Sequence, residues 1–139
     1  MIVLDTNVVS EAMRPAPDTE VLGWLNAQVI DTLYLSSVTL AELLFGVGVL
    51  PAGARRDRLA RTVDGLVALF PGRVLPFDQD AARRYANMAS AGQKAGRPLS
   101  TADGYIAATA AAHGFAVASR NARHFAGTGV ELINPWQDH

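Results

Sequence analysis

Residues 1–7 read Met-Ile-Val-Leu-Asp-Thr-Asn, and the rest of the chain is organised around this stretch. Three apolar residues, two of them β-branched, lead into a carboxylate and two short polar side chains, which is typical of a buried strand that ends at the edge of a sheet. In an open parallel sheet, ligands bind outside the carboxyl ends of the strands. The position of Asp5 therefore suits chemistry, and the simpler alternative is that Asp5 caps the helix that follows.

Strand and helix patterns alternate along the whole chain. Short apolar runs predict strands at 2–4, 33–36, 74–77, 115–118 and 130–133. Apolar residues spaced three and four apart, with capping residues before them, predict helices at 7–13, 18–29, 37–47, 54–69, 79–93 and 100–112. Ser37 is expected to cap the third helix and Gly114 to close the sixth, whose many alanines predict close approach of neighbouring backbone. The expected apolar faces include Leu22 and Val29 in the second helix and Leu44 in the third. This alternation favours parallel strands joined by right-handed helical crossovers. We expect a single domain over residues 1–139, an α/β protein built as a three-layer α/β/α sandwich with a central five-stranded parallel sheet.

Composition excludes several classes of protein. Half of the 139 residues are hydrophobic and 18% are charged, which favours a well-packed globule. The formal net charge of −1 gives no indication of a nucleic-acid partner, so such a role would depend on local charge. The chain has no cysteine, which rules out disulfides and thiolate metal sites. Because it also lacks a secretory signal pattern and a membrane-spanning apolar run, we expect a cytoplasmic protein with no membrane contact.

Three carboxylates occupy comparable positions near element ends. Asp5 ends the first strand, Glu42 lies in the helix after the second strand, and Asp103 lies in the first turn of the helix before the fourth strand. In a doubly wound sheet they can face one crevice, where a divalent cation would offset their mutual repulsion. Oxygen ligands suit Mg²⁺ or Mn²⁺, which activate water for attack on phosphodiesters. Residues expected to hydrogen-bond to these ligands or to the substrate are Thr6, Asn7, Ser119 and Asn121.

Other acidic and basic residues have simpler interpretations. Asp78 is expected to cap the helix at 79–93, and Asp80 to lie in its first turn. Four arginines within 54–69 predict a solvated helix face, with phosphate contact as the alternative. These residues are therefore not candidates for catalysis.

Four motifs, in order along the chain, resemble those of PIN-domain proteins. They are Leu4-Asp5-Thr6-Asn7, Ala41-Glu42-Leu43 with Gly46, the segment Ala102–Ala110, and Ala118-Ser119-Arg120-Asn121. The chain resembles most the VapC-type toxins of bacterial toxin–antitoxin pairs, including the FitB-like branch, which tends to end in Asn-Pro-Trp as residues 134–136 do. Each motif alone is common, but four at this spacing are specific, and they span essentially the whole chain.

This resemblance implies a metal-dependent endoribonuclease that acts as the toxin of a type II toxin–antitoxin pair and hydrolyses single-stranded or structured RNA. It implies a small antitoxin partner, VapB-like or FitA-like, and self-association as a homodimer or a dimer of dimers. Asp5, Glu42 and Asp103 match the family's first three acidic residues. Where the family often places a fourth, this chain has Asn121 and His124. We therefore expect one metal ion, or a second one held weakly, and a surface or structural role for His124.

Two alternatives accompany this interpretation. A phosphatase with Asp5 as nucleophile resembles haloacid-dehalogenase-type enzymes, but these have a second Asp two residues on, where this chain has Asn7. A PIN-like module without efficient cleavage would instead bind nucleic acid or an antitoxin. Basic residues near predicted element ends are the candidates for RNA contact: Arg14, Lys94, Arg97, Arg120 and Arg123.

Overall fold

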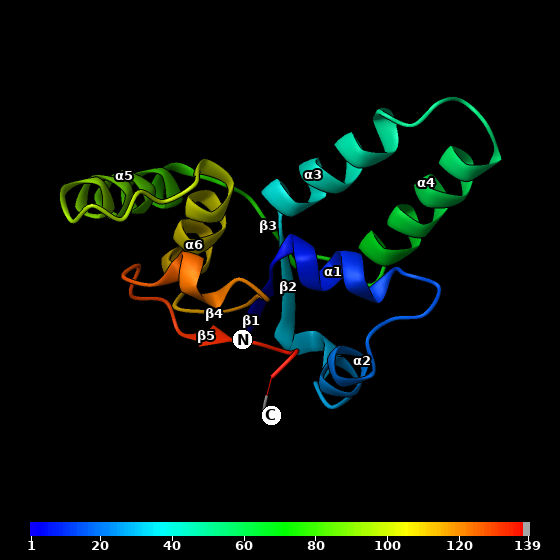
Figure 1. Cartoon of the computed structure of the whole chain (residues 1–139), viewed down its shortest axis with the longest axis horizontal. Helices are drawn as coiled ribbons and strands as arrows, with labels where there is room; N and C mark the ends of the chain where they lie inside the picture. Colours follow the sequence, from blue (N-terminus) through cyan, green and yellow to red (C-terminus); the bar gives the residue numbers. More distant parts are fainter. Residues whose placement is uncertain (138–139) are drawn as a thin grey trace.

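The computed structural model describes residues 1–137 and is built on a five-stranded parallel sheet with strand order β3-β2-β1-β4-β5 (Figure 1). The strands are β1 (Ile2–Leu4), β2 (Leu33–Ser36), β3 (Val74–Leu75), β4 (Ala116–Ala118) and β5 (Leu132–Ile133). The helices are α1 (Thr6–Ala12), α2 (Thr19–Asn26), α3 (Ser37–Gly48), α4 (Ala54–Val67), α5 (Gln79–Lys94) and α6 (Thr101–His113), with two short 3-10 helices, η1 (Ile30–Thr32) and η2 (Ala122–Phe125). The predicted α/β fold with a parallel sheet is confirmed.

The first strand, β1, lies at the centre of the sheet. Ile2 is level with Leu33 of β2 on one side and with Ala116 of β4 on the other. The Asp5 amide donates a hydrogen bond of 2.9 Å to the Ala118 carbonyl, just where both strands end. The segments that follow β1 and β4 therefore lie side by side, although they are far apart in the sequence.

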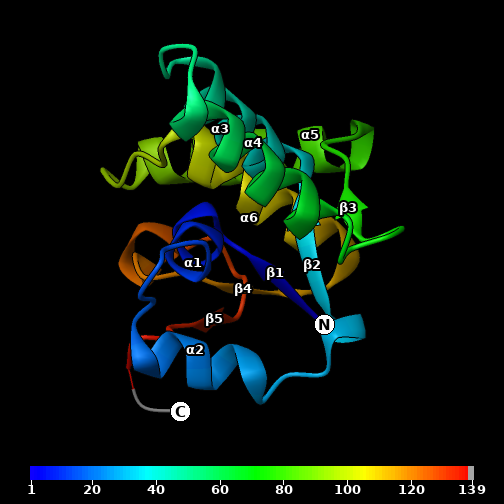
Figure 2. The ribbon, with the colours of Figure 1, turned by 90° about the vertical axis from the view of Figure 1, so that its right-hand side faces the viewer.

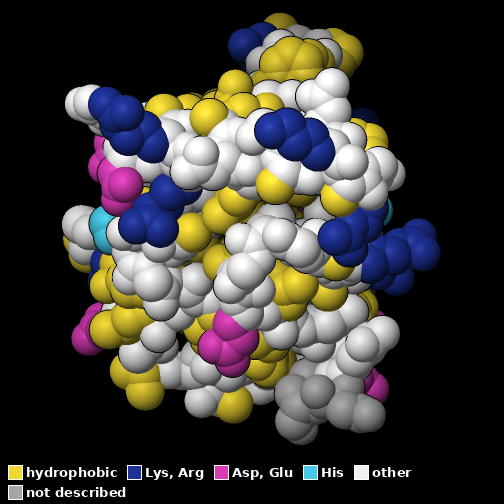
Figure 3. Space-filling model, turned by 90° about the vertical axis from the view of Figure 1, so that its left-hand side faces the viewer, with side chains coloured by type: hydrophobic (Ala, Val, Ile, Leu, Met, Phe, Trp, Pro, Cys, Tyr) yellow, Lys and Arg dark blue, Asp and Glu magenta, His cyan; other side chains and the backbone are white. Residues whose placement is uncertain are grey.

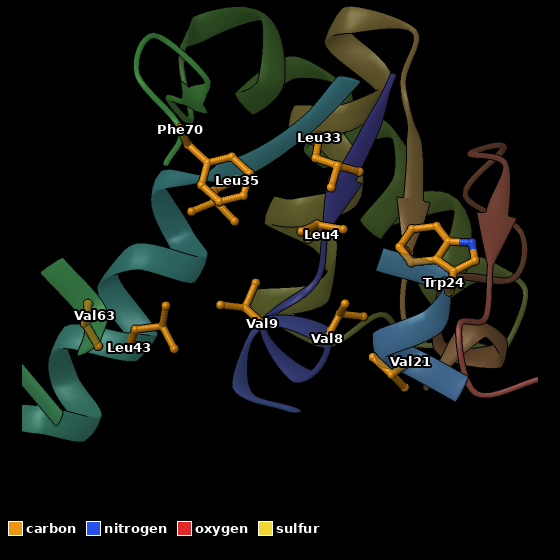
Figure 4. Close-up of a cluster of buried hydrophobic side chains, with 11 residues drawn as sticks. Leu4, Val8, Val9, Val21, Trp24, Leu33, Leu35, Leu43, Val63 and Phe70 are labelled. Atoms are coloured by element: carbon orange, nitrogen blue, oxygen red, sulfur yellow. The ribbon is translucent and has the colours of Figure 1, made fainter. Parts of the chain in front are cut away.

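The sheet separates two apolar clusters, which gives the molecule its three layers. Alternate residues of a strand point to opposite faces. Leu4 packs with α1 and α2, through residues such as Val8 and Trp24 (Figure 4), whereas Val3 packs with Ile106 of α6. The helices α3 and α4 contact each other and form a pair beside α1 (Figure 2).

The packing of α5 against α6 depends on small residues, as the alanine-rich sequence of α6 predicts. Gly104 is buried, and a Cβ atom there would lie 2.6 Å from Cε1 of Tyr85. The Tyr85 and Tyr105 rings are 4.8 Å apart between centroids, and Tyr105 also stacks on Phe77 at 4.4 Å. This close approach fixes the start of α6, where Asp103 lies.

Several predicted boundaries and burial patterns were wrong. Helix α2 ends at Asn26, so Val29 lies beyond it and is 67% exposed; Leu22, which was expected on the apolar face, is 40% exposed because the buried face runs through Val21 and Trp24. The residue that caps α3 is Ser36 rather than Ser37. β3 stops before Pro76, which has no N–H to donate to the ladder.

Smaller differences are at the ends of other elements. Helix α1 begins at residue 6 instead of 7, α4 ends at 67 instead of 69, and β5 spans 132–133 instead of 130–133. Leu44, predicted to be part of the apolar face of α3, is 49% exposed. Within residues 1–137, no helix is long and apolar enough to cross a membrane.

Candidate active site

The three predicted carboxylates line one open cavity of about 570 Å³ at the carboxyl ends of β1 and β4. Asp5 is contributed by the end of β1, Glu42 by α3 and Asp103 by the first turn of α6. The other lining residues are Thr6, Asn7, Ser10, Glu11, Arg14, Arg120, Asn121 and Trp136. The topology therefore brings together acidic groups that are separated by most of the sequence.

Asp5 both caps α1 and faces the cavity, so the two alternatives for this residue coexist. Asp5 is only 4% exposed to solvent. The Thr6 amide donates to Oδ1 of Asp5 at 2.8 Å, and the Ser119 hydroxyl donates to Oδ2 at 2.7 Å. Both carboxylate oxygens are thus held in place from opposite sides.

The pKa of Asp5 is raised above its ordinary value. The largest cause is burial, which disfavours the charged carboxylate. The hydrogen bonds from Ser119 and Thr6 lower the pKa, and the negative charges of Asp103 and Glu42 raise it again. Asp5 therefore senses the other two carboxylates electrostatically, as expected for acidic groups around a shared crevice.

Glu42 is positioned by a chain of hydroxyl groups from α1, α3 and the end of β2. Thr6 Oγ1 donates to Glu42 Oε1 at 2.7 Å, and Thr6 Oγ1 lies 3.0 Å from Thr39 Oγ1. Because Thr6 uses its proton on Glu42, Thr39 is the donor in the second contact. Ser36 Oγ in turn donates to Thr39 Oγ1 at 3.3 Å. The buried hydroxyls of Ser36 and Thr39 thus orient Thr6, and Thr6 orients Glu42.

Asp103 is more exposed to solvent than Asp5. Its side chain is 22% exposed, and its backbone N–H is capped by the Ser100 hydroxyl at 3.3 Å. Oδ2 of Asp103 lies 3.6 Å from Nδ1 of His124. His124, 49% exposed, therefore lies at the surface beside a site carboxylate.

The polar residues after β1 and β4 form a network around Ser119. The Ser119 hydroxyl accepts hydrogen bonds from the Asn121 amide at 3.1 Å and from Asn7 Nδ2 at 3.4 Å. Asn7 Oδ1 accepts one from the Arg120 amide at 3.2 Å. Of the four predicted hydrogen-bonding residues, three line the cavity, and Ser119 is buried behind them.

Three residues of the site were missed by sequence reasoning. Trp136 lines the cavity, and the Arg120 guanidinium lies 5.2 Å from the centre of its ring. Glu11 is 7% exposed and pairs with Arg14 at 3.3 Å. Thr39 supports Thr6 from outside the cavity. The sequence offered one signal for Thr39: it is a polar residue between apolar positions of a predicted helix.

The donor set of the cavity fits a hard divalent cation. The acidic side chains and their hydrogen-bonding neighbours offer oxygen ligands and no sulfur. In the described part of the chain, no three Asp, Glu or His side chains are already gathered closely enough to hold an ion. Glu42 is exposed and Asp103 partly so. Asp5, Glu42 and Asp103 are the cavity residues that would hold such an ion.

The chain belongs to the PIN-domain family, since the family model for the PIN domain matches residues 2–130. It is 51% identical over 138 residues to VapC ribonuclease Y4jK from Sinorhizobium fredii, with 99% of each chain covered. It is 43% identical over 139 residues to toxin FitB from Neisseria gonorrhoeae, with 99% of this chain and 100% of that protein covered. The resemblance inferred from the four motifs is thereby confirmed.

Solved structures give the same result. The crystal structure of FitAcB from Neisseria gonorrhoeae matches with a TM-score of 0.94 and 42% identity, covering 99% of both chains. The structure of FitAB bound to an IR36 DNA fragment matches with the same TM-score and 41% identity, covering 100% of this chain and 98% of that chain. The fold is therefore that of FitB-type PIN domains.

Proposed function

We propose that this protein is a metal-dependent endoribonuclease that acts as the toxin of a type II toxin–antitoxin pair. The observation that carries the proposal is the placement of Asp5, Glu42 and Asp103 on one cavity, where the charges of the latter two raise the pKa of the buried Asp5. The printed names of the relatives, a VapC ribonuclease and a FitB toxin, support the same activity.

In this proposal Asp5, Glu42 and Asp103 hold a divalent cation, Mg²⁺ or Mn²⁺. When bound, the cation supplies positive charge that activates water and stabilises the phosphate oxygens of RNA. Thr6 orients Glu42, and Ser119 fixes one oxygen of Asp5. Because Asn121 and His124 replace a fourth carboxylate, the site has the charge for one ion and holds a second only weakly.

The proposed substrate is single-stranded or looped RNA, because unpaired backbone can bend into a cavity of this shape. Arg14 and Arg120 line the cavity and are placed to bind phosphates. Arg97 and Arg123 line a neighbouring cavity. Lys94 lines neither cavity, so it is the weakest of the five basic residues considered from the sequence.

The proposed partners are a small antitoxin and a second copy of the chain, in the cytoplasm. The match to FitAB bound to DNA supports an antitoxin of the FitA or VapB type. Exposed apolar side chains on α3 and directly after it support contacts with an antitoxin or with a second copy: Leu44 is 49%, Phe45 72% and Val49 62% exposed. The central position of β1 supports the proposal that residues 1–139 act as one domain.

A binding module without efficient cleavage is the second candidate. The observation that favours it is that the carboxylates are not already gathered around one point in the described residues. It would bind nucleic acid or an antitoxin through the same surface.

One experiment separates the two candidates. The purified chain, freed of any partner, is incubated with single-stranded RNA and either Mg²⁺ or Mn²⁺. A ribonuclease cuts the RNA, stops on addition of EDTA, and loses at least about 100-fold of its rate on Asp5→Asn. RNA binding without metal-dependent cutting would support the module instead.

A further inference from the structure

A second cavity, of about 610 Å³, adjoins the carboxylate site. It lies between the end of α5, the loop 95–100, the start of α6 and the segment 123–128. Asp103 lines both cavities and is the one residue that they share. The second cavity therefore adjoins the carboxylate site at Asp103.

The lining of the second cavity combines apolar and basic groups. Met88, Leu99 and neighbouring alanines supply apolar surface, and Arg97, Arg123 and His124 supply basic groups. Asp103 is the single acidic residue of the lining, at the side that faces the carboxylate site. Figure 3, viewed from the side of α5, shows basic side chains distributed around exposed apolar atoms on this face.

Arg97 lies close to two glycines, Gly92 and Gly127. Its N–H donates to the Gly92 carbonyl at 2.8 Å, and a Cβ atom on Gly92 would lie only 2.7 Å from the Arg97 carbonyl oxygen. A Cβ atom on Gly127 would lie 3.4 Å from Nη2 of Arg97. The Arg97 side chain therefore reaches from the α5–α6 loop to the segment after η2, and Arg97 lines the cavity.

We propose that this second cavity binds the nucleotide next to the phosphodiester bond that is cut, an inference that rests on the proposed ribonuclease function. The base lies against Met88 and Leu99, and its phosphate is bound by Arg97 and Arg123. Guanidinium groups match phosphate oxygens in charge and geometry. A volume of about 610 Å³ is in the ordinary range for ligand pockets.

A binding experiment on a cleavage-deficient background tests the site. Asp5→Asn protein is titrated with a fluorescein-labelled pool of random single-stranded RNA, about twelve nucleotides long, in rising salt. The double variant Arg97→Ala/Arg123→Ala is compared with Arg55→Ala/Arg58→Ala, which removes the same charge from α4, away from both cavities.

We expect the cavity variant to bind RNA about 10- to 100-fold more weakly and its salt slope to fall by about 1.4, since each lost phosphate contact removes about 0.7 for single strands. The α4 variant should keep both values. Equal losses of RNA affinity in the two variants, or no loss in either, would overturn the proposed site. In the first case the positive charge attracts RNA without a specific site, and in the second the RNA binds elsewhere.

Photo-cross-linking provides an independent measurement. RNA containing 4-thiouridine should cross-link to peptides covering residues 88–99 and 123–128, and cross-links confined to other segments would overturn the proposal. Binding here without cutting would overturn the ribonuclease activity and leave this site standing. Cutting with an unchanged kcat/KM in the Arg97→Ala/Arg123→Ala variant would overturn this site alone.

Discussion

The Ser119 hydroxyl donates a hydrogen bond of 2.7 Å to Oδ2 of Asp5, which joins the ends of two neighbouring strands. The Ser119 hydroxyl oxygen also accepts hydrogen bonds from the Asn121 amide and from Asn7 Nδ2. Ser119 is fully buried and Asp5 nearly so. The bond therefore fixes the orientation of the most buried carboxylate of the site.

Removal of this donor should be costly. We expect Ser119→Ala to lower the free energy of unfolding by about 1–3 kcal/mol, because a buried carboxylate oxygen loses its partner. The pKa of Asp5 should rise further, since this bond is what lowers it most. Urea denaturation measures the first effect, and the rate of RNA cleavage against pH, shifted to higher pH, measures the second. An unchanged pH profile would mean that Ser119 has only a structural role.

The raised pKa of Asp5 makes stability depend on pH in a definite direction. The folded protein binds this proton more tightly than the unfolded chain, so the stabilisation is fully present below the unfolded pKa, about 3.9, and is lost as pH rises through the folded pKa. In EDTA, the stability of the unsubstituted protein relative to Asp5→Asn should therefore fall across that window. A stability difference that rises with pH would contradict the assigned direction. Added Mg²⁺ should stabilise the unsubstituted protein at neutral pH.

Asp103→Ala should abolish cleavage while changing the stability by less than about 1 kcal/mol. Loss of a carboxylate from the first turn of α6 lowers the stability of the helix. Two effects offset this loss: the repulsion between Asp103 and Asp5 is removed, and alanine has a higher helix propensity than aspartate. Asp80→Ala is the matched control, because Asp80 lies in the first turn of α5 and forms an ion pair with the partly exposed Arg84. A melting temperature several degrees lower for Asp103→Ala would assign this residue a structural role.

Thr6→Val tests the positioning of Glu42. Loss of the hydroxyl removes its 2.7 Å bond to Glu42 and its contact with Thr39. We expect about 10-fold slower cleavage and a higher Mg²⁺ concentration for half-maximal rate, in line with the effect of residues that support metal ligands. Thr6→Ser, which keeps the hydroxyl, should restore the Mg²⁺ dependence. A loss in stability with an unchanged Mg²⁺ requirement would contradict a positioning role.

Gly104→Ala tests the packing that fixes the start of α6. The added Cβ would lie 2.6 Å from the Tyr85 ring and 3.1 Å from Leu99, so we expect a loss of about 1–3 kcal/mol in urea denaturation. Gly65→Ala in α4, where nothing lies within 4 Å, should instead gain about 0.5–1 kcal/mol. Equal effects of the two substitutions would show that helix propensity dominates over close packing.

Much of the architecture follows from local sequence patterns, because strands and helix caps are short-range features. The apolar run before Asp5 and the glycine at 114, with φ of 70°, each predicted an element end that the structure confirms. Burial on a helix was harder to predict. Leu22 is as apolar as Val21, and only the position of α2 against the sheet leaves it exposed.

Site residues could be predicted where they lie at the end of a strand or helix. They were missed where their role depends on contacts with residues distant in the sequence. Asp5 and Asp103 follow from their places beside predicted strand and helix termini. Thr39 acts through Thr6, which is 33 positions away, and Trp136 meets the cavity only because β5 pairs with β4. Such partners are fixed by strand order, which no local pattern encodes.

The central position of β1 has a consequence for protein synthesis. The ribosome makes Asp5 more than a hundred residues before Ser119 and before the strand β4 that pairs with β1. A nascent or prematurely terminated chain that lacks β4 leaves one edge of β1 unpaired and the Asp5 carboxylate without its buried donor. The cavity is thus completed only after β4 and Ser119 have been synthesised.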